Sequence, residues 1–224
     1  PRQDKDKNFV QEKSETKFKS STDITPTLNE QVKSKFTSRK DSIAQVGRIT
    51  INNKKVNGSI SLRGGIFDDL SFKNYMQELD SKEEVVFLNP KETEDGFYIE
   101  TGWTSVGNKI KVPTLDTVWS VKGNRNLDEK TPVVLEWNNG QGLIFKKIIK
   151  LDEKYLFKIK QEIKNNTNKT VELYPYAQIT RNKKPDDVQG FYILHEGFIG
   201  VFDDELKEDS YEDVVEKKIS RESD

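Results

Sequence analysis

The sequence predicts an all-β domain, an antiparallel β sandwich, and three observations support this fold class. Apolar and polar residues alternate through residues 135–203, as in strands that bury one face. Turn-forming residues interrupt this alternation about every eight to twelve residues. No convincing amphipathic helix separates the strands. About a dozen strands in two packed antiparallel sheets are therefore expected.

The first strands form a predicted β-meander. Alternation begins near Val46, a polar turn follows at residues 52–55, and residues 56–62 return with apolar side chains on one face. Gly64-Gly65 then turns the chain into a strand over residues 66–72.

The middle of the chain is less regular. Residues 85–88 are a continuous apolar run, which predicts a strand covered on both faces. Residues 97–103 and 115–121 alternate again. Residues 73–84 are ambiguous, and a short helix there is compatible with the sequence.

The second half contains the clearest hairpin signal. Strands over residues 133–137 and 143–151 flank Asn139-Gly140, a pair typical of a type I′ turn. A second turn over residues 165–169 joins strands at 155–163 and 170–180. Short strands at 191–194 and 198–202 complete the β region.

Both ends of the chain differ from this domain, which we expect to span residues 45–204. Residues 1–44 contain nine apolar residues and are predicted to be a disordered linker. Residues 205–224 are acidic and predicted to be a short helix or exit linker, since Ser210 is followed three residues later by Asp213.

Composition excludes several classes of protein. The chain has 37 Lys and Arg against 38 Asp and Glu, with no basic block typical of a nucleic-acid binder. It has no cysteine for disulfides or thiolate metal sites, and no apolar run long enough to span a bilayer. Because the first residue is Pro1, we expect the chain to be part of a longer protein.

No catalytic, metal or cofactor site is predicted. His195 is the only histidine, and the His195-Glu196 pair lacks the second histidine of a zinc-protease motif because Ile199 occupies that position. Carboxylates in predicted strands could form a glycosidase pair, but solvated strand faces explain these residues without one. The carboxylates are Glu100, Glu136, Glu162, Glu172 and Glu196.

Tyr174 and Tyr176 are the candidate partner-binding residues. They share one face of a predicted strand, where aromatic side chains could anchor a partner or a sugar, or pack against a neighbour. Pro175 between them predicts an edge strand or a bulge.

Three blocks of the chain resemble a known family. They are GRITINNKKVNGSISLRGGIFDDLSFKNY (47–75), LEWNNGQGLIFKKIIKLDEKYLFKI (135–159), and LYPYAQITR (173–181) followed by GFYILHEGFIGVFDD (190–204). In order and spacing they resemble the large periplasmic domain of the YidC-type bacterial membrane protein insertases.

The resemblance implies more than the residues do alone. It implies a β super-sandwich similar to sugar-mutarotase folds, between an N-terminal membrane helix and a membrane core outside this chain. It implies an accessory, non-catalytic role in the periplasm at the inner membrane, beside nascent membrane proteins. The implied partners are SecD/SecF and the Sec translocon. The alternative from the residues is a carbohydrate-binding or sugar-modifying sandwich.

Overall fold

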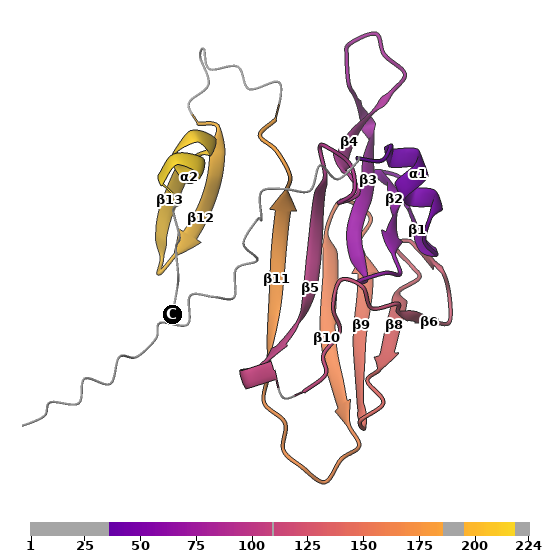
Figure 1. Ribbon diagram of the computed structural model, residues 1–224. Helices are drawn as coiled ribbons and strands as arrows, with labels where there is room; N and C mark the ends of the chain where they lie inside the picture. The colour runs from indigo at the N-terminus through magenta and orange to yellow at the C-terminus, as the bar shows by residue number, and fades with distance from the viewer. Residues whose placement is uncertain (1–35, 109, 186–194, 218–224) are drawn as a thin grey trace, which may run out of the picture. The chain divides into compact units, whose positions relative to one another are not determined.

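The computed structural model describes residues 36–108, 110–185 and 195–217, and these residues form an all-β sandwich with two short helices (Figure 1). This confirms the predicted fold class. The strands are β1 (Arg48–Asn52), β2 (Val56–Ser61), β3 (Ile66–Met76), β4 (Glu84–Leu88), β5 (Phe97–Ser105), β6 (Ser120–Lys122), β7 (Asn126–Leu127), β8 (Val133–Asn138), β9 (Leu143–Leu151), β10 (Phe157–Asn165), β11 (Leu173–Arg181), β12 (Gly197–Phe202) and β13 (Glu205–Ser210). The helices are α1 (Arg39–Ala44), α2 (Tyr211–Lys217) and a single 3-10 turn, η1 (Val106–Asn108).

The larger sheet has seven strands in the order β11-β5-β3-β2-β1-β7, with β4 paired to β3. The β1–β2–β3 meander is antiparallel, as predicted, and the short β1–β7 pair is parallel. Ile60 lies opposite Phe67 while Ser59 lies opposite Asp69, so Asp68 is the extra residue of a β-bulge.

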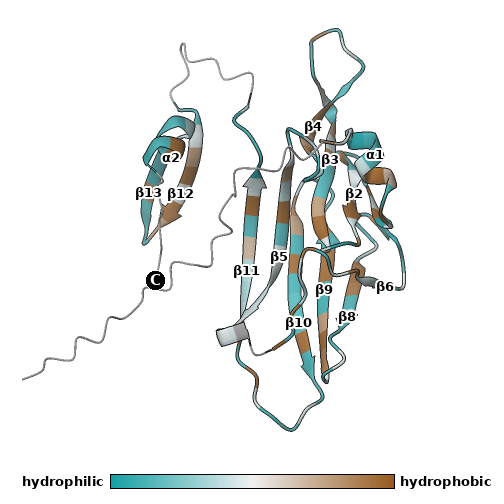
Figure 2. Cartoon of the chain, in the orientation of Figure 1, coloured by the Kyte–Doolittle hydropathy of each residue, from teal (hydrophilic) through white to brown (hydrophobic). Residues whose placement is uncertain are grey.

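The smaller sheet has four antiparallel strands in the order β10-β9-β8-β6. Along β9 buried residues alternate with more exposed ones. Figure 2 shows both hydrophobic and hydrophilic bands along this strand. One face of this sheet therefore packs on the core and the other faces solvent.

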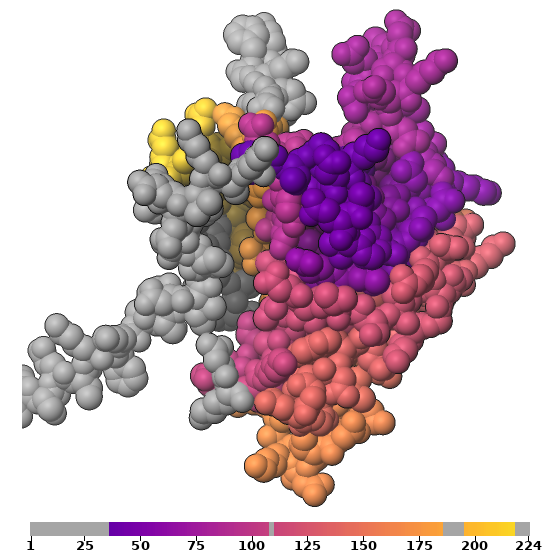
Figure 3. All heavy atoms as spheres, turned by 45° about the vertical axis from the view of Figure 1, so that its right-hand side comes forward, coloured from indigo at the N-terminus to yellow at the C-terminus, as the bar shows by residue number. Residues whose placement is uncertain are grey.

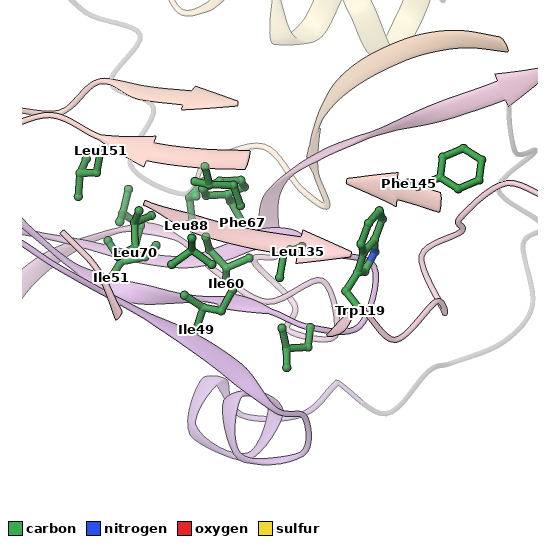
Figure 4. Packing of buried hydrophobic residues seen from close by; sticks show 14 of the residues in the cluster. Ile49, Ile51, Ile60, Phe67, Leu70, Leu88, Trp119, Leu135, Phe145 and Leu151 are labelled. Atoms are coloured by element: carbon green, nitrogen blue, oxygen red, sulfur yellow. The ribbon is translucent and has the colours of Figure 1, made fainter. Parts of the chain in front are cut away.

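The core lies between the inner faces of the two sheets (Figure 4). Aliphatic residues from both sheets fill most of it, and Trp103 contacts Phe145 with ring centroids 5.1 Å apart. The most completely buried apolar side chains are Trp119, Phe145, Ile49, Ile51, Ile60, Leu88, Leu127, Leu135, Ile149, Val56 and Val133.

Helix α1 lies within residues 1–44, the stretch that the sequence predicts to be a linker. Ser38 caps the helix by accepting a hydrogen bond from the Asp41 amide at 3.1 Å. Arg39 forms an ion pair with the buried Asp69, and Ser42 is buried. These contacts join the helix to the seven-stranded sheet. Residues 1–35 lie outside the described residues.

The hairpin between β8 and β9 is present, but its turn is not type I′. Such a turn needs positive φ at both central residues. Here only Gly140 and Gly142 have positive φ, in a longer loop. The Asn139 side chain is buried and accepts hydrogen bonds from the amides of Gln141 (2.7 Å) and Leu143 (3.1 Å), so it organises the loop itself.

Two further strand predictions need correction. Residues 85–88 are not covered on both faces, since only Leu88 of them is buried and Phe87 is exposed. Residues 73–84 contain no helix; β3 continues to Met76, and Gln77 and Glu83 close a hairpin turn through a 2.9 Å backbone hydrogen bond.

The hairpin β12–β13 and helix α2 form a small element of their own. Asp203 and Asp204 both have positive φ at its two-residue turn. The domain boundary predicted between residues 204 and 205 falls within this turn, between two paired strands. The short C-terminal helix is confirmed, and the Ser210 hydroxyl accepts a hydrogen bond from the Asp213 amide. The strand predicted at 191–194 lies outside the described residues.

Neither α1 nor α2 has the length and hydropathy of a membrane-crossing helix, and the rest of the described chain contains no other candidate.

Candidate functional site: an apolar groove between the sheets

An apolar groove of about 610 Å³ lies between the inner face of the seven-stranded sheet and strand β10. Its walls come from β2, β3, β4 and β5 on one side and from β10 and the turn before it on the other. The lining residues are Val56, Phe67, Leu70, Phe72, Tyr75, Val85, Phe87, Leu88, Ile99, Tyr155, Phe157 and Ile159.

Aromatic contacts organise the groove around Phe72. Its ring centroid lies 5.0 Å from that of Phe87, 5.6 Å from that of Tyr155 and 6.0 Å from that of Tyr75. Deeper in the groove, Phe67 and Phe157 meet edge to face at 5.5 Å and join the two sheets. Edge-to-face and offset pairs are the preferred geometries of aromatic rings, so these walls are preformed.

The mouth of the groove is exposed. Tyr75, Phe87 and Tyr155 are each at least 39% exposed although they line it. Partial desolvation and the neighbouring Tyr75 raise the pKa of Tyr155. The two tyrosines share a hydrogen bond, so their hydroxyls lie together at the rim. The two tyrosine hydroxyls are the polar side-chain groups among the lining residues, so the interior presents hydrocarbon.

One wall of the groove is the β3–β4 hairpin, which projects from the body of the domain (Figure 3). Leu79 at its tip is fully exposed. At the other end, the buried Asn53 joins two turns, because its side-chain amide donates to the carbonyls of Asp152 (2.9 Å) and Lys154 (3.2 Å). Asn53 thereby fixes the turn that carries Tyr155.

The apolar surface continues past the groove onto the edge strand β11. Ile179 lies directly opposite Ile99 in the β5–β11 pairing and therefore shares its face of the sheet. Ile179 is 68% exposed. The site can therefore hold an extended apolar segment, because it offers apolar contact area along several strands. Its lining residues carry no carboxylate, amine or imidazole that could transfer a proton.

Tyr174 and Tyr176 lie on the opposite face of the sheet from this groove. Tyr176 packs over Gly102, where an added Cβ would approach the tyrosine ring to 2.6 Å. Burial, and a hydrogen bond to Glu100, raise the pKa of Tyr176 to about 12. Tyr174 is exposed and donates its hydroxyl hydrogen to Glu172 at 2.6 Å. β11 is the edge strand that Pro175 predicts.

The five carboxylates considered for chemistry are not assembled into a site. Glu136 forms ion pairs with Lys122 and Lys146, both at 3.3 Å, and Glu162 with Lys160 at 2.6 Å. Glu172 and Glu100 accept hydrogen bonds from the two tyrosines. His195 and Glu196 precede β12, where the His195 Nε2 atom is buried without a hydrogen-bond partner in the described chain. No cluster of three or more potential metal ligands occurs among the described residues.

Sequence reasoning did not identify the groove. Its residues come from strands far apart in the chain, and single strands such as residues 85–88 looked like ordinary buried core. The available signal was an excess of aromatic residues over positions 67–87, with Phe67, Phe72, Tyr75 and Phe87 on two consecutive strands.

Comparison with known proteins gives a consistent result. A family model described as "YidC periplasmic domain" matches residues 48–224. A protein named "Membrane protein insertase YidC" from Pelagibacter ubique is 44% identical over 197 residues, which cover 88% of this chain and 35% of that protein. Proteins of the same name from Methylobacterium radiotolerans (41% over 182 residues; 80% of this chain, 29% of that protein) and Bradyrhizobium diazoefficiens (40% over 196 residues; 87% and 31%) are also similar. The chain thus spans about a third of the length of these curated relatives.

Proposed function

Because this chain belongs to the YidC periplasmic-domain family, we propose that it acts without catalysis, as a docking module of a membrane protein insertase whose apolar groove receives extended apolar segments of client proteins. The domain lies in the periplasm at the bacterial inner membrane. The single observation that carries the proposal is a preformed, aromatic-lined groove of about 610 Å³ with an exposed mouth.

The chemistry of the groove selects the occupant. Proteins that an insertase handles carry long apolar segments, which are costly to leave in water. A groove lined by hydrocarbon removes apolar area from water while making few directional bonds, so it binds such segments without reading a particular sequence. The walls contain no flexible methionine, and their aromatic rings are held by contacts with one another, so the groove has little freedom to repack around a bulky ligand. This favours a narrow, extended occupant.

The alternative of a carbohydrate site has less support. A sugar needs hydrogen-bonding groups for its hydroxyls, and the groove supplies two tyrosine hydroxyls at its rim. The tyrosine pair considered for sugar stacking does not present two free rings, since Tyr176 packs on Gly102.

A second surface is proposed for translocon partners. The edge strand β11 carries Tyr174 with its ring exposed, and an edge strand offers unpaired backbone groups to another chain. We retain SecD/SecF as the expected partners on this surface, on the basis of the family.

The groove is tested by binding of a dansyl-labelled leucine–alanine peptide to the purified chain, followed by fluorescence. Phe87→Glu places a charge at the mouth and should weaken binding at least about tenfold, because burying a Phe side chain is worth roughly 1.5–3 kcal/mol. Phe36→Glu changes an exposed phenylalanine that does not line the groove and should leave binding unchanged. Equal affinity of wild type and Phe87→Glu would refute the groove as the binding site.

A further inference from the structure

The outer face of the four-stranded sheet gathers lysines that are far apart in the chain. Strand pairing places Lys122 of β6, Lys146 and Lys150 of β9, and Lys158, Lys160 and Lys164 of β10 on this one face. We call these six residues the lysine face. Two glutamates share the surface, Glu136 and Glu162, so its net charge is 6 − 2 = +4 in a chain whose total is −1.

Three of the six lysines form ion pairs with glutamates, and the other three do not. Glu136 bridges Lys122 and Lys146, and Glu162 pairs with Lys160. Lys150, Lys158 and Lys164 are exposed, and no carboxylate in the described chain pairs with them.

The register places two of the unpaired lysines against each other. Lys158 lies directly opposite Lys150 in the β9–β10 pairing. Like charges at such cross-strand positions destabilise a sheet. A surface that only has to be soluble usually intersperses positively and negatively charged side chains. The positive charge is therefore concentrated here at a cost in stability, and an external anion would offset that cost.

The shape and chemistry of the face favour a bilayer over an acidic protein. The face spans about 30 Å along β10 and roughly 15 Å across the four strands, and it is a regular sheet surface. All six cations are lysines and none is an arginine. Lysine is a mobile point charge suited to diffuse attraction, whereas bidentate recognition of a protein carboxylate favours arginine. The domain also works beside a membrane.

We propose that the lysine face docks this domain onto the surface of a bilayer that contains anionic phospholipids. The attraction is electrostatic and reversible. Each lysine near such a surface contributes about a fivefold factor in binding, and the interaction weakens as salt shortens the Debye length. This docking uses a different surface from the groove and does not depend on client binding.

The test is sedimentation of the full chain with vesicles of equal parts phosphatidylcholine and phosphatidylglycerol, and with vesicles of phosphatidylcholine alone. Wild type should bind the anionic vesicles at low ionic strength and be released at about 1 M salt, where the Debye length is roughly 3 Å. The variant Lys150→Gln/Lys158→Gln/Lys164→Gln should bind at least about tenfold more weakly. Its folding is checked by circular dichroism, and all three side chains are exposed.

The matched control is Lys40→Gln/Lys54→Gln/Lys82→Gln, which removes the same charge from exposed lysines outside the lysine face. It should bind within about twofold of wild type, because none of these three lysines belongs to the lysine face. The proposal is overturned if wild type does not bind the anionic vesicles, if binding is equal on neutral vesicles, or if both triple variants lose binding equally. Binding of an acidic protein by the lysine face, with no vesicle binding, would also overturn it.

Discussion

At the scale of single residues, Lys147 is the least expected side chain in this domain. It points inward from β9, is 1% exposed, and donates to the carbonyls of Gly64 and Gly65 at 3.2 Å each. Its ammonium also lies 5.0 Å from the centroid of the Trp119 ring. Two carbonyls and an aromatic face replace water incompletely, so burial lowers the pKa of Lys147 to about 8.

The lowered pKa of Lys147 predicts how the stability of the domain changes with pH. Between about pH 8 and 10.5 the unfolded chain keeps the Lys147 proton while the folded chain loses it, so the free energy of unfolding should rise with pH by up to about 3 kcal/mol. Lys147→Met should abolish this rise, whereas Lys150→Met, an exposed lysine of the same strand, should retain it. Guanidinium unfolding at pH 7 and pH 10 measures the difference. The same pH dependence in wild type and Lys147→Met would contradict this account.

At the scale of elements, the turns show where a sequence pattern is sufficient and where it is not. The meander and the β8–β9 hairpin were predictable because a period of two and turn residues act locally. The turn type was not, since Asn139 is buried and uses its side chain within the loop. Helix α1 was missed because six residues give no periodicity, and an ion pair with Asp69, distant in the chain, anchors it. The groove required the pairing of whole sheets, which no local pattern contains.

The two-residue turn of the β12–β13 hairpin supplies a prediction at this scale. Asp204 has φ +63°, a conformation that glycine adopts without steric cost. Asp204→Gly should stabilise the hairpin by about 1 kcal/mol and slow amide hydrogen exchange in both strands. Glu205→Gly, one position further on within the strand, should accelerate exchange, because glycine weakens a strand interior. Faster exchange in Asp204→Gly than in wild type would show that the aspartate is needed at the turn.

At the scale of the whole molecule, different surfaces carry different chemistry. The groove opens between the sheets, the edge strand β11 borders the seven-stranded sheet, and the lysine face is the outer side of the four-stranded sheet. An apolar client, a protein partner and an anionic bilayer therefore need not compete for one site. A domain held beside a membrane also meets its partners at high effective concentration, so each contact can be weak and reversible.

Separate surfaces make the partner proposal testable in the longer protein. Deleting residues 36–217, which removes the described domain, should reduce co-purification of SecD/SecF from membranes while insertion of simple clients continues. Tyr174→Ala should also reduce the recovery of SecD/SecF, because the exposed Tyr174 ring lies on the edge strand. Phe87→Glu should leave this recovery unchanged, because Phe87 lines the groove on the opposite face of the sheet from Tyr174. Unchanged recovery of both partners after the deletion would exclude this domain as their docking site, and equal losses in the two point variants would mean that the groove itself receives the partner.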